Sequence, residues 1–170
     1  MSRTNLLMPD LRYASKKQLA QLTGARLHLL CAWINKGAQM NTASQSRWLK
    51  LGLSKLQSSE LIDTLINDSA IRQRFQKEIY QMIAEANVAE FTNDHLLYAQ
   101  GRQLEALTGF GDRQFHDWFS GRQLSKSTRL LLCLKLDIEE AVLMKGIEQR
   151  RSHVQTVRKA QKYIDIFLAT

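Results

Sequence analysis

The sequence has little of what turn-rich, disulfide-bonded or membrane-spanning proteins need. Proline occurs once and glycine eight times in 170 residues, which disfavours a β architecture with many tight turns. The two cysteines, Cys31 and Cys133, lack metal-ligand spacing, so we expect reduced thiols in a cytoplasm. No apolar run approaches the roughly 18 residues that a membrane span requires, and the N-terminal apolar stretch is too short for a secretory signal.

Motifs for catalysis and cofactor binding are also missing from the sequence. It contains no Gly-rich phosphate loop, no nucleophile elbow and no cluster of paired carboxylates. The four histidines are far apart and form no HxxxH pattern, so we expect no metal site and no cofactor. These absences predict a protein that is not an enzyme.

Helix-forming residues and positive charge are what the sequence has in abundance. Leu, Gln, Ala, Lys, Arg and Glu dominate, and they lose little conformational freedom in a helix, so an all-α fold is predicted. The formal net charge of +8 favours a polyanionic partner, either nucleic acid or an anionic membrane surface. Because no membrane element is found, we expect nucleic acid as the partner and a cytoplasmic, nucleoid-associated protein without membrane contact.

The chain contains an internal repeat with an offset of 85 residues. Residues 11–53 align with residues 96–138 without a gap, and twelve of these 43 positions are identical. In the first copy the recurring residues are Leu11, Tyr13, Ala14, Gln18, Leu19, Leu22, Thr23, Gly24, Trp33, Leu49, Lys50 and Leu51. We therefore predict two domains, residues 1–85 and residues 86–170, each built from one copy of the unit.

A longer amphipathic helix is expected to follow the compact part of each copy. Apolar residues recur at three- and four-residue steps from Leu61 to Met82, and again from Val154 to Leu168. Packing in a core or in a dimer explains both stripes, so these trailing helices could bring a homodimer or a protein partner together. Thr92, Asn93 and Asp94 offer N-caps at the start of the second copy.

Both copies carry the pattern of two short helices joined by a glycine turn. Ser15 with Gln18 forms a capping box that opens the first helix, and Gly24 or Gly109 ends that helix. Trp33 and Trp118 lie nine positions after these glycines, where they can pack against the first helix. We predict that both tryptophans are buried and that the opposite edge of the second helix is exposed.

Here the residues resemble a known family. The string LEALTGFGDRQFHDWFSG, followed by LSKSTRLLLCLKLDI, is similar to the Cro and lambda-repressor type of helix-turn-helix DNA-binding domain. The first copy offers a similar series: Leu19, Ala20, Gly24, Leu30, Trp33, Leu49, Leu51, Gly52 and Leu53. The resemblance implies sequence-specific binding of double-stranded DNA by a repressor-like regulator of transcription, in phage, plasmid or mobile-element style. Its second helix would enter the major groove.

The resemblance also implies roles for individual side chains. The expected base-reading residues are Arg113, Gln114, His116, Arg26 and His28. Phosphate contacts are expected from basic residues at helix ends and turns, namely Lys16, Lys17, Lys36, Arg47, Arg102, Arg122, Lys126 and Arg129.

Two other functions remain open at this point. Residues 1–55 hold nine Lys or Arg and one acidic residue, whereas residues 96–138 hold six basic and four acidic residues. The second copy therefore also fits an adaptor that recruits a protein within a nucleoprotein complex, and exposed Leu27 and Leu29 would favour that reading of the first copy. Binding of single strands or RNA would instead need exposed aromatic residues for stacking.

Overall fold

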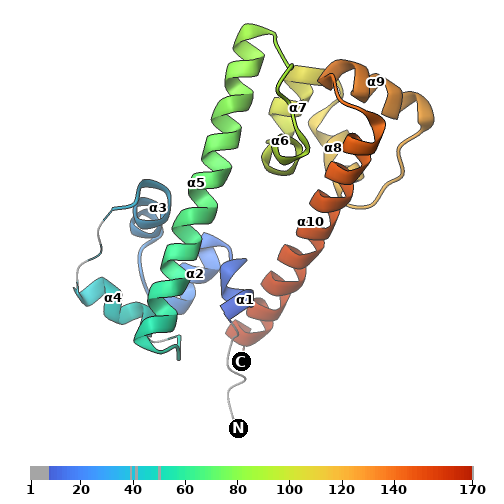
Figure 1. Cartoon of the computed structure of the whole chain (residues 1–170). Coiled ribbons are helices and arrows are strands. Elements are labelled where there is room, and N and C mark those ends of the chain that lie inside the picture. Colours follow the sequence, from blue (N-terminus) through green and yellow to red (C-terminus); the bar gives the residue numbers. More distant parts are fainter. Residues whose placement is uncertain (1–7, 39, 41, 50, 170) are drawn as a thin grey trace. The chain divides into compact units, whose positions relative to one another are not determined.

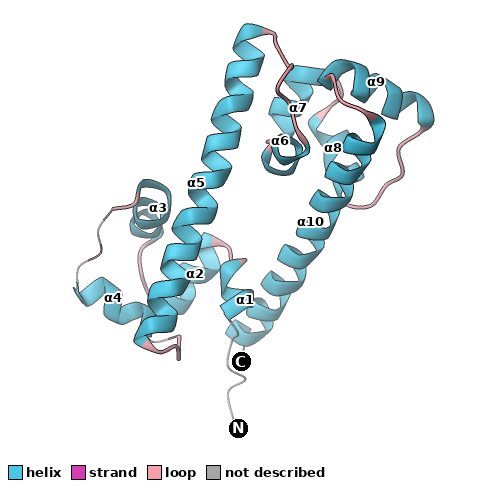
Figure 2. Ribbon diagram, in the orientation of Figure 1, coloured by secondary structure: helices cyan, strands magenta, loops and turns pink. Residues whose placement is uncertain are grey.

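Helix-forming residues and local caps set the secondary structure of the chain. The computed structural model describes residues 8–38, 40, 42–49 and 51–169, and there every regular element is an α-helix (Figure 1, Figure 2). The first five helices are α1 (Met8–Arg12), α2 (Lys16–Thr23), α3 (Leu27–Lys36), α4 (Thr42–Leu49) and α5 (Lys55–Glu85). The next five are α6 (Asn93–Tyr98), α7 (Gly101–Thr108), α8 (Asp112–Phe119), α9 (Lys126–Leu136) and α10 (Glu140–Ala169). The all-α prediction is confirmed.

The two sets of helices follow the same order along the chain. α1 and α6, α2 and α7, α3 and α8, and α5 and α10 each begin 85 positions apart. The two long helices have 31 and 30 residues and are the green and red rods of Figure 1. Lys50, one of the residues that recur in the sequence, lies outside the described residues.

Predicted caps define several of the helix starts. Ser15 opens α2 with the expected capping box, because its hydroxyl accepts from the Gln18 N–H and the Gln18 side chain accepts from the Ser15 N–H. Of the three predicted candidates, Thr92 is the N-cap of α6. α10 begins at Glu140, fourteen residues before Val154, where its apolar periodicity was expected to begin.

The chain divides into two compact units whose bounds differ from the repeat. The first unit contains Met1–Ile71 and Thr156–Thr170, and the second contains Arg72–Gln155. Each long helix therefore supplies residues to both units. The predicted domains, 1–85 and 86–170, would instead have kept each long helix with the copy that precedes it. That each copy folds as a domain by itself stays a prediction.

Helices from both ends of the chain form the core of the first unit. Leu30 and Trp33 of α3 pack with Trp48 of α4, and α5 and α10 contribute Leu61 and Ile164. Trp33 is 4% exposed, so the prediction of its burial is confirmed.

The core of the second unit uses the same kinds of elements. Phe115 and Trp118 of α8 pack with Leu132 of α9, while α5 and α10 contribute Ile79 and Ile147. Trp118 is 7% exposed, which confirms that it is buried as predicted. In both units, burial of this apolar face fixes which edge of α3 or α8 is left for solvent.

Candidate nucleic-acid interface

A glycine turn with identical hydrogen bonds precedes α3 and α8. Gly24 and Gly109 adopt left-handed backbone angles, with φ of 73° and 81°. Just before each glycine a threonine hydroxyl donates to a main-chain oxygen at 2.7 Å, from Thr23 to Leu19 and from Thr108 to Leu104. Each threonine oxygen then accepts the N–H of the residue after the glycine. This chemistry lets the chain reverse sharply without leaving buried polar groups unpaired.

The inward face of α8 is an aromatic cluster. Trp118 makes edge-to-face contacts with Phe115, at 5.1 Å between ring centroids, and with Phe110, at 5.5 Å. Such pairs hold ring orientations more firmly than aliphatic contacts do. α8 is consequently anchored along one side, and its rotation about its own axis is fixed.

The outward edge of α8 carries the predicted base-reading residues of the second copy. Arg113, Gln114 and His116 are all exposed. The Gln114 carboxamide oxygen, however, accepts the Gly111 N–H at 2.9 Å as part of the helix cap. A two-point contact from Gln114 to adenine would need that oxygen, so it would have to break the cap. The exposed Arg113 takes no part in this cap.

The outward edge of α3 is less polar than that of α8. Arg26, which is the N-cap, and His28 are exposed as expected. Cys31 and Ala32 of the same helix are half-buried. Leu27 is 50% exposed, whereas Leu29 is half-buried against the core of the first unit.

The predicted phosphate-binding residues differ in how available they are. Five are exposed, namely Lys17, Lys36, Arg102, Arg122 and Lys126, and three are half-buried, namely Lys16, Arg47 and Arg129. Three have partners within the chain: Arg129 pairs with Glu140 at 3.0 Å, Arg122 lies 3.8 Å from Asp117, and Arg102 donates to Gln100 at 2.9 Å. The first unit contains Lys16, Lys17, Lys36 and Arg47 together with Arg26 and His28, and the second unit contains the other four.

Two arginines of α10 that sequence analysis missed support this region. Arg151 is 8% exposed and donates to the main-chain oxygens of Trp118, at 2.7 Å, and of Arg122, at 2.5 Å. It also pairs with Glu148 at 2.9 Å. A buried cation thus binds one carbonyl in the last turn of α8 and one in the loop that follows the helix. The signal was visible in the sequence, because Arg150 and Arg151 interrupt an apolar stripe where the first copy has Leu65 and Ile66.

Other kinds of site find little support in the part of the chain that the structure describes. It holds no group of three or more His, Cys, Asp or Glu placed to bind a metal ion. None of its helices combines the length and apolarity needed to cross a membrane. Comparison of the chain with family models, curated proteins and solved structures gives no match.

Proposed function

We propose that the chain is a sequence-specific double-stranded DNA-binding protein, a repressor-like regulator of transcription that acts at the nucleoid in the cytoplasm. Its two helix-turn-helix headpieces are α2–α3 and α7–α8. The single observation that carries the proposal is the turn shared by both. In each headpiece a threonine and a left-handed glycine orient a second helix with its tryptophan inward and a polar edge outward.

The exposed side chains support duplex DNA over unpaired strands. Arg113 and Arg26 are exposed near the start of α8 and α3, the end that reaches base edges when such a helix enters the major groove. Trp33 and Trp118 are buried and so are not placed to stack on unpaired bases. The net charge of +8 supplies the long-range attraction to phosphate.

The first test is a mobility-shift series with random duplex, single-stranded DNA and RNA at several salt concentrations. The proposal expects tighter binding to duplex and a steep loss of affinity as salt increases. Selection of bound fragments from a random duplex library then supplies the preferred site. Equal binding to all three nucleic acids, or binding to none, contradicts the proposal.

The second test separates base reading from phosphate binding. Arg113→Ala should reduce discrimination at one base pair of the selected site by about 1–3 kcal/mol, because it removes a donor to a base edge. Lys17→Ala should weaken binding to all duplexes alike and reduce the salt slope by about 1. Lys77→Ala and Lys145→Ala remove the same charge from exposed positions on α5 and α10 and serve as controls. Unchanged selectivity in Arg113→Ala would show that α8 does not read bases.

An adaptor that recruits a protein is the second candidate, and exposed leucines favour it. On α9, Leu130, Leu131 and Leu134 are exposed, Leu134 by 75%. In the first copy, Gln45 and Ser46 stand at the positions that correspond to Leu130 and Leu131, whereas Leu134 corresponds to another leucine, Leu49. If the Leu130→Gln, Leu134→Gln double variant loses function in the source cell while its affinity for duplex DNA stays unchanged, the result favours the adaptor function for the second copy.

A further inference from the structure

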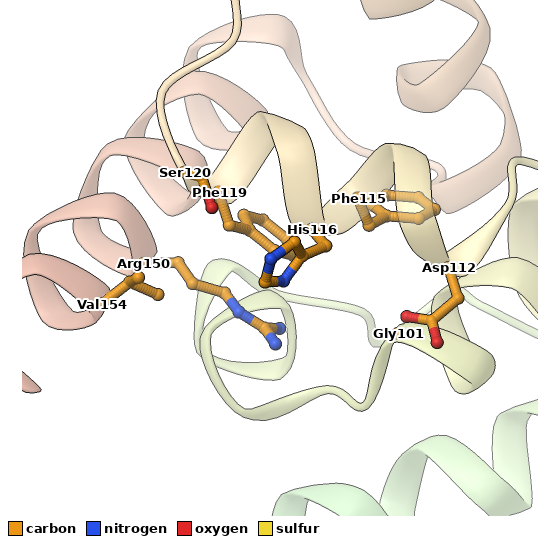
Figure 3. A pocket seen from close by; sticks show the side chains of 8 residues that line it. All are labelled: Gly101, Asp112, Phe115, His116, Phe119, Ser120, Arg150 and Val154. Carbon is orange, nitrogen blue, oxygen red and sulfur yellow. The ribbon is translucent and has the colours of Figure 1, made fainter. Parts of the chain in front are cut away.

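A small cavity lies in the second unit along one flank of α8, lined by both exposed polar and buried apolar residues. Its volume is about 120 Å³. The lining residues come from the start of α7, from α8 and its C-terminal end, and from α10: Gly101, Asp112, Phe115, His116, Phe119, Ser120, Arg150 and Val154 (Figure 3). A cavity of this size has room for several water molecules, and therefore for a ligand of five or six non-hydrogen atoms.

Arg150 forms a fixed cationic wall of this cavity. One guanidinium nitrogen, Nη1, donates to the main-chain oxygens of Leu96, at 2.7 Å, and of Ala99, at 2.6 Å. The guanidinium also lies over the Phe119 ring, 4.1 Å from its centroid. These contacts hold the group rigidly but use only main-chain oxygens and a ring. Within the described residues no carboxylate lies within ion-pair distance of it.

Burial has a measurable cost for this cation. Loss of water lowers the pKa of Arg150 to about 10, and the negative charge of Asp112 opposes that shift. The guanidinium is still protonated at neutral pH. It is therefore a buried charge that a negatively charged group in the cavity would stabilise.

Asp112 forms the opposite, anionic wall. Figure 3 shows its carboxylate apart from the Arg150 guanidinium, with the His116 ring next to the guanidinium in the view. The carboxylate lies over the first residue of α7, where a Cβ on Gly101 would be 1.6 Å from Asp112 Oδ1. Only glycine at position 101 leaves room for the Asp112 carboxylate, and the N-terminal end of α7 stabilises the negative charge of that carboxylate.

The charged walls are specific to the second copy. The positions that correspond to Arg150, Asp112 and His116 in the first copy are Leu65, Leu27 and Cys31. Leu65 is part of the apolar core of the first unit. The same helical framework thus forms with apolar residues at these positions, so the fold itself does not require a cation and a carboxylate facing a cavity.

We infer that this cavity binds a small zwitterion, an α-amino acid of the size of glycine or alanine. Its carboxylate would pair with Arg150 and its ammonium group with Asp112, while Phe115 and Val154 contact the carbon atoms. A simple anion would meet repulsion from Asp112, and a simple cation would meet repulsion from Arg150. A zwitterion satisfies both walls at once. The inference does not depend on DNA binding, because it concerns the free protein.

Calorimetric titration of the full chain without DNA tests this binding. The probes are glycine, alanine, acetate and methylammonium at one ionic strength, with phenylalanine as an oversized amino acid. We expect saturable one-to-one binding of glycine or alanine, and binding at least tenfold weaker for the other three. No saturable binding of glycine or alanine overturns the inference. Equal binding of acetate also overturns it and would show a plain anion site.

Variants of the two walls complete the test. Asp112→Asn keeps the shape of the side chain and should weaken glycine binding at least tenfold. Asp117→Asn, a carboxylate of the same helix outside the cavity lining, should leave it unchanged. Arg150→Met should abolish binding, and its far-ultraviolet circular dichroism shows whether it folds. If it does not fold, Asp112→Asn decides alone, and unchanged glycine affinity in that variant overturns the inference.

Discussion

The side-chain amide of Gln103 donates to the main-chain oxygen of Gln76 at 2.9 Å. In the other unit, Gln18 donates to the main-chain oxygen of Gln161 at 2.8 Å. The two donors are 85 positions apart, and so are the two acceptors. The donor of the second copy binds an acceptor that precedes it in the chain, whereas the donor of the first copy binds an acceptor that follows it. The side-chain amides of Gln76 and Gln161 in turn donate hydrogen bonds of 3.0 and 3.1 Å to the main-chain oxygens of residues 98 and 13, which are again 85 positions apart. The long helix that each pair engages therefore belongs to the other copy of the repeat.

These amides should contribute strongly to stability. Gln103 is 1% exposed, and its oxygen also accepts the N–H of Gln100. Gln103→Ala removes its two side-chain hydrogen bonds, to the half-buried Gln76 carbonyl and the half-buried Gln100 N–H, so we expect a loss of about 1–3 kcal/mol in the free energy of unfolding. Urea denaturation of the full chain measures this value. Gln18→Ala should behave alike, whereas Gln123→Ala, at an exposed position, should change stability by less than about 0.5 kcal/mol. Equal effects at Gln103 and Gln123 would refute the prediction.

Gly101 should tolerate a side chain only when Asp112 is shortened. In the native chain Gly101→Ala displaces the Asp112 carboxylate from the start of α7, with an expected cost of about 0.5–2 kcal/mol. In an Asp112→Ala background the same change should be neutral or stabilising, because alanine favours helix over glycine. A double-mutant cycle by thermal and urea unfolding gives the coupling. Additive effects would mean that the two positions do not interfere.

Arg151 should be hard to replace because it binds two main-chain oxygens from a buried position. Arg151→Met removes the donors to Trp118 and Arg122 while it keeps much of the apolar stem, so we expect a loss of about 2–4 kcal/mol. Arg151→Lys should recover only part of this, since an ammonium group cannot reproduce the fork of a guanidinium. The control, Lys145→Met, changes an exposed residue of the same helix. A similar stability of both methionine variants would disprove the role of Arg151.

Cys133 should react slowly with alkylating agents in the folded protein. Burial, and then the nearby charge of Glu140, raise the pKa of its thiol. In a Cys31→Ser background, the rate of iodoacetamide reaction against pH should have a higher midpoint for folded than for urea-unfolded protein. Because the unfolded thiol ionises first, the same shift lowers stability as the pH rises past the pKa of the unfolded state.

Glu140→Gln should move that midpoint to lower pH, since it removes one of the two causes of the shift. Glu139→Gln changes a neighbouring exposed carboxylate and should have little effect. If the folded and unfolded midpoints coincide, the environment assigned to Cys133 is wrong.

Local signals in the sequence predicted much of the fold. Gly24 and Gly109 identified the turns because only a residue without a side chain adopts their backbone angles at low cost. Ser15 and Thr92 identified helix starts because their hydroxyls accept main-chain N–H groups. Apolar periodicity placed both tryptophans inside. The start of α10 was harder to predict from the sequence. Arg150 and Arg151 interrupt the apolar stripe of this helix, and a periodicity argument treats arginines as exposed.

The candidate sites depended more on contacts between distant segments. The exposure of Arg113 and His116 could be predicted from helical geometry alone. The hydrogen bond from the Gly111 N–H to the Gln114 side-chain oxygen was apparent only in the structure. Arg150 of α10 binds main-chain oxygens at the C-terminal end of α6, more than fifty residues earlier in the chain. Asp112 of α8 approaches Gly101, which belongs to a different helix. No spacing rule connects such residues. The division of α5 and α10 between two units likewise depends on contacts between segments that are far apart in the sequence.

That division sets an order of completion during synthesis on the ribosome. Every residue of the second unit has been added once Gln155 is in place, whereas the first unit, begun earlier, still needs Thr156–Thr170. At translation rates of about 5–20 residues per second, the earlier-made part of the core around Trp48 stays incomplete for several seconds after it leaves the exit tunnel. The nascent N-terminal segment would then be the natural client of a ribosome-bound chaperone, although it is made first.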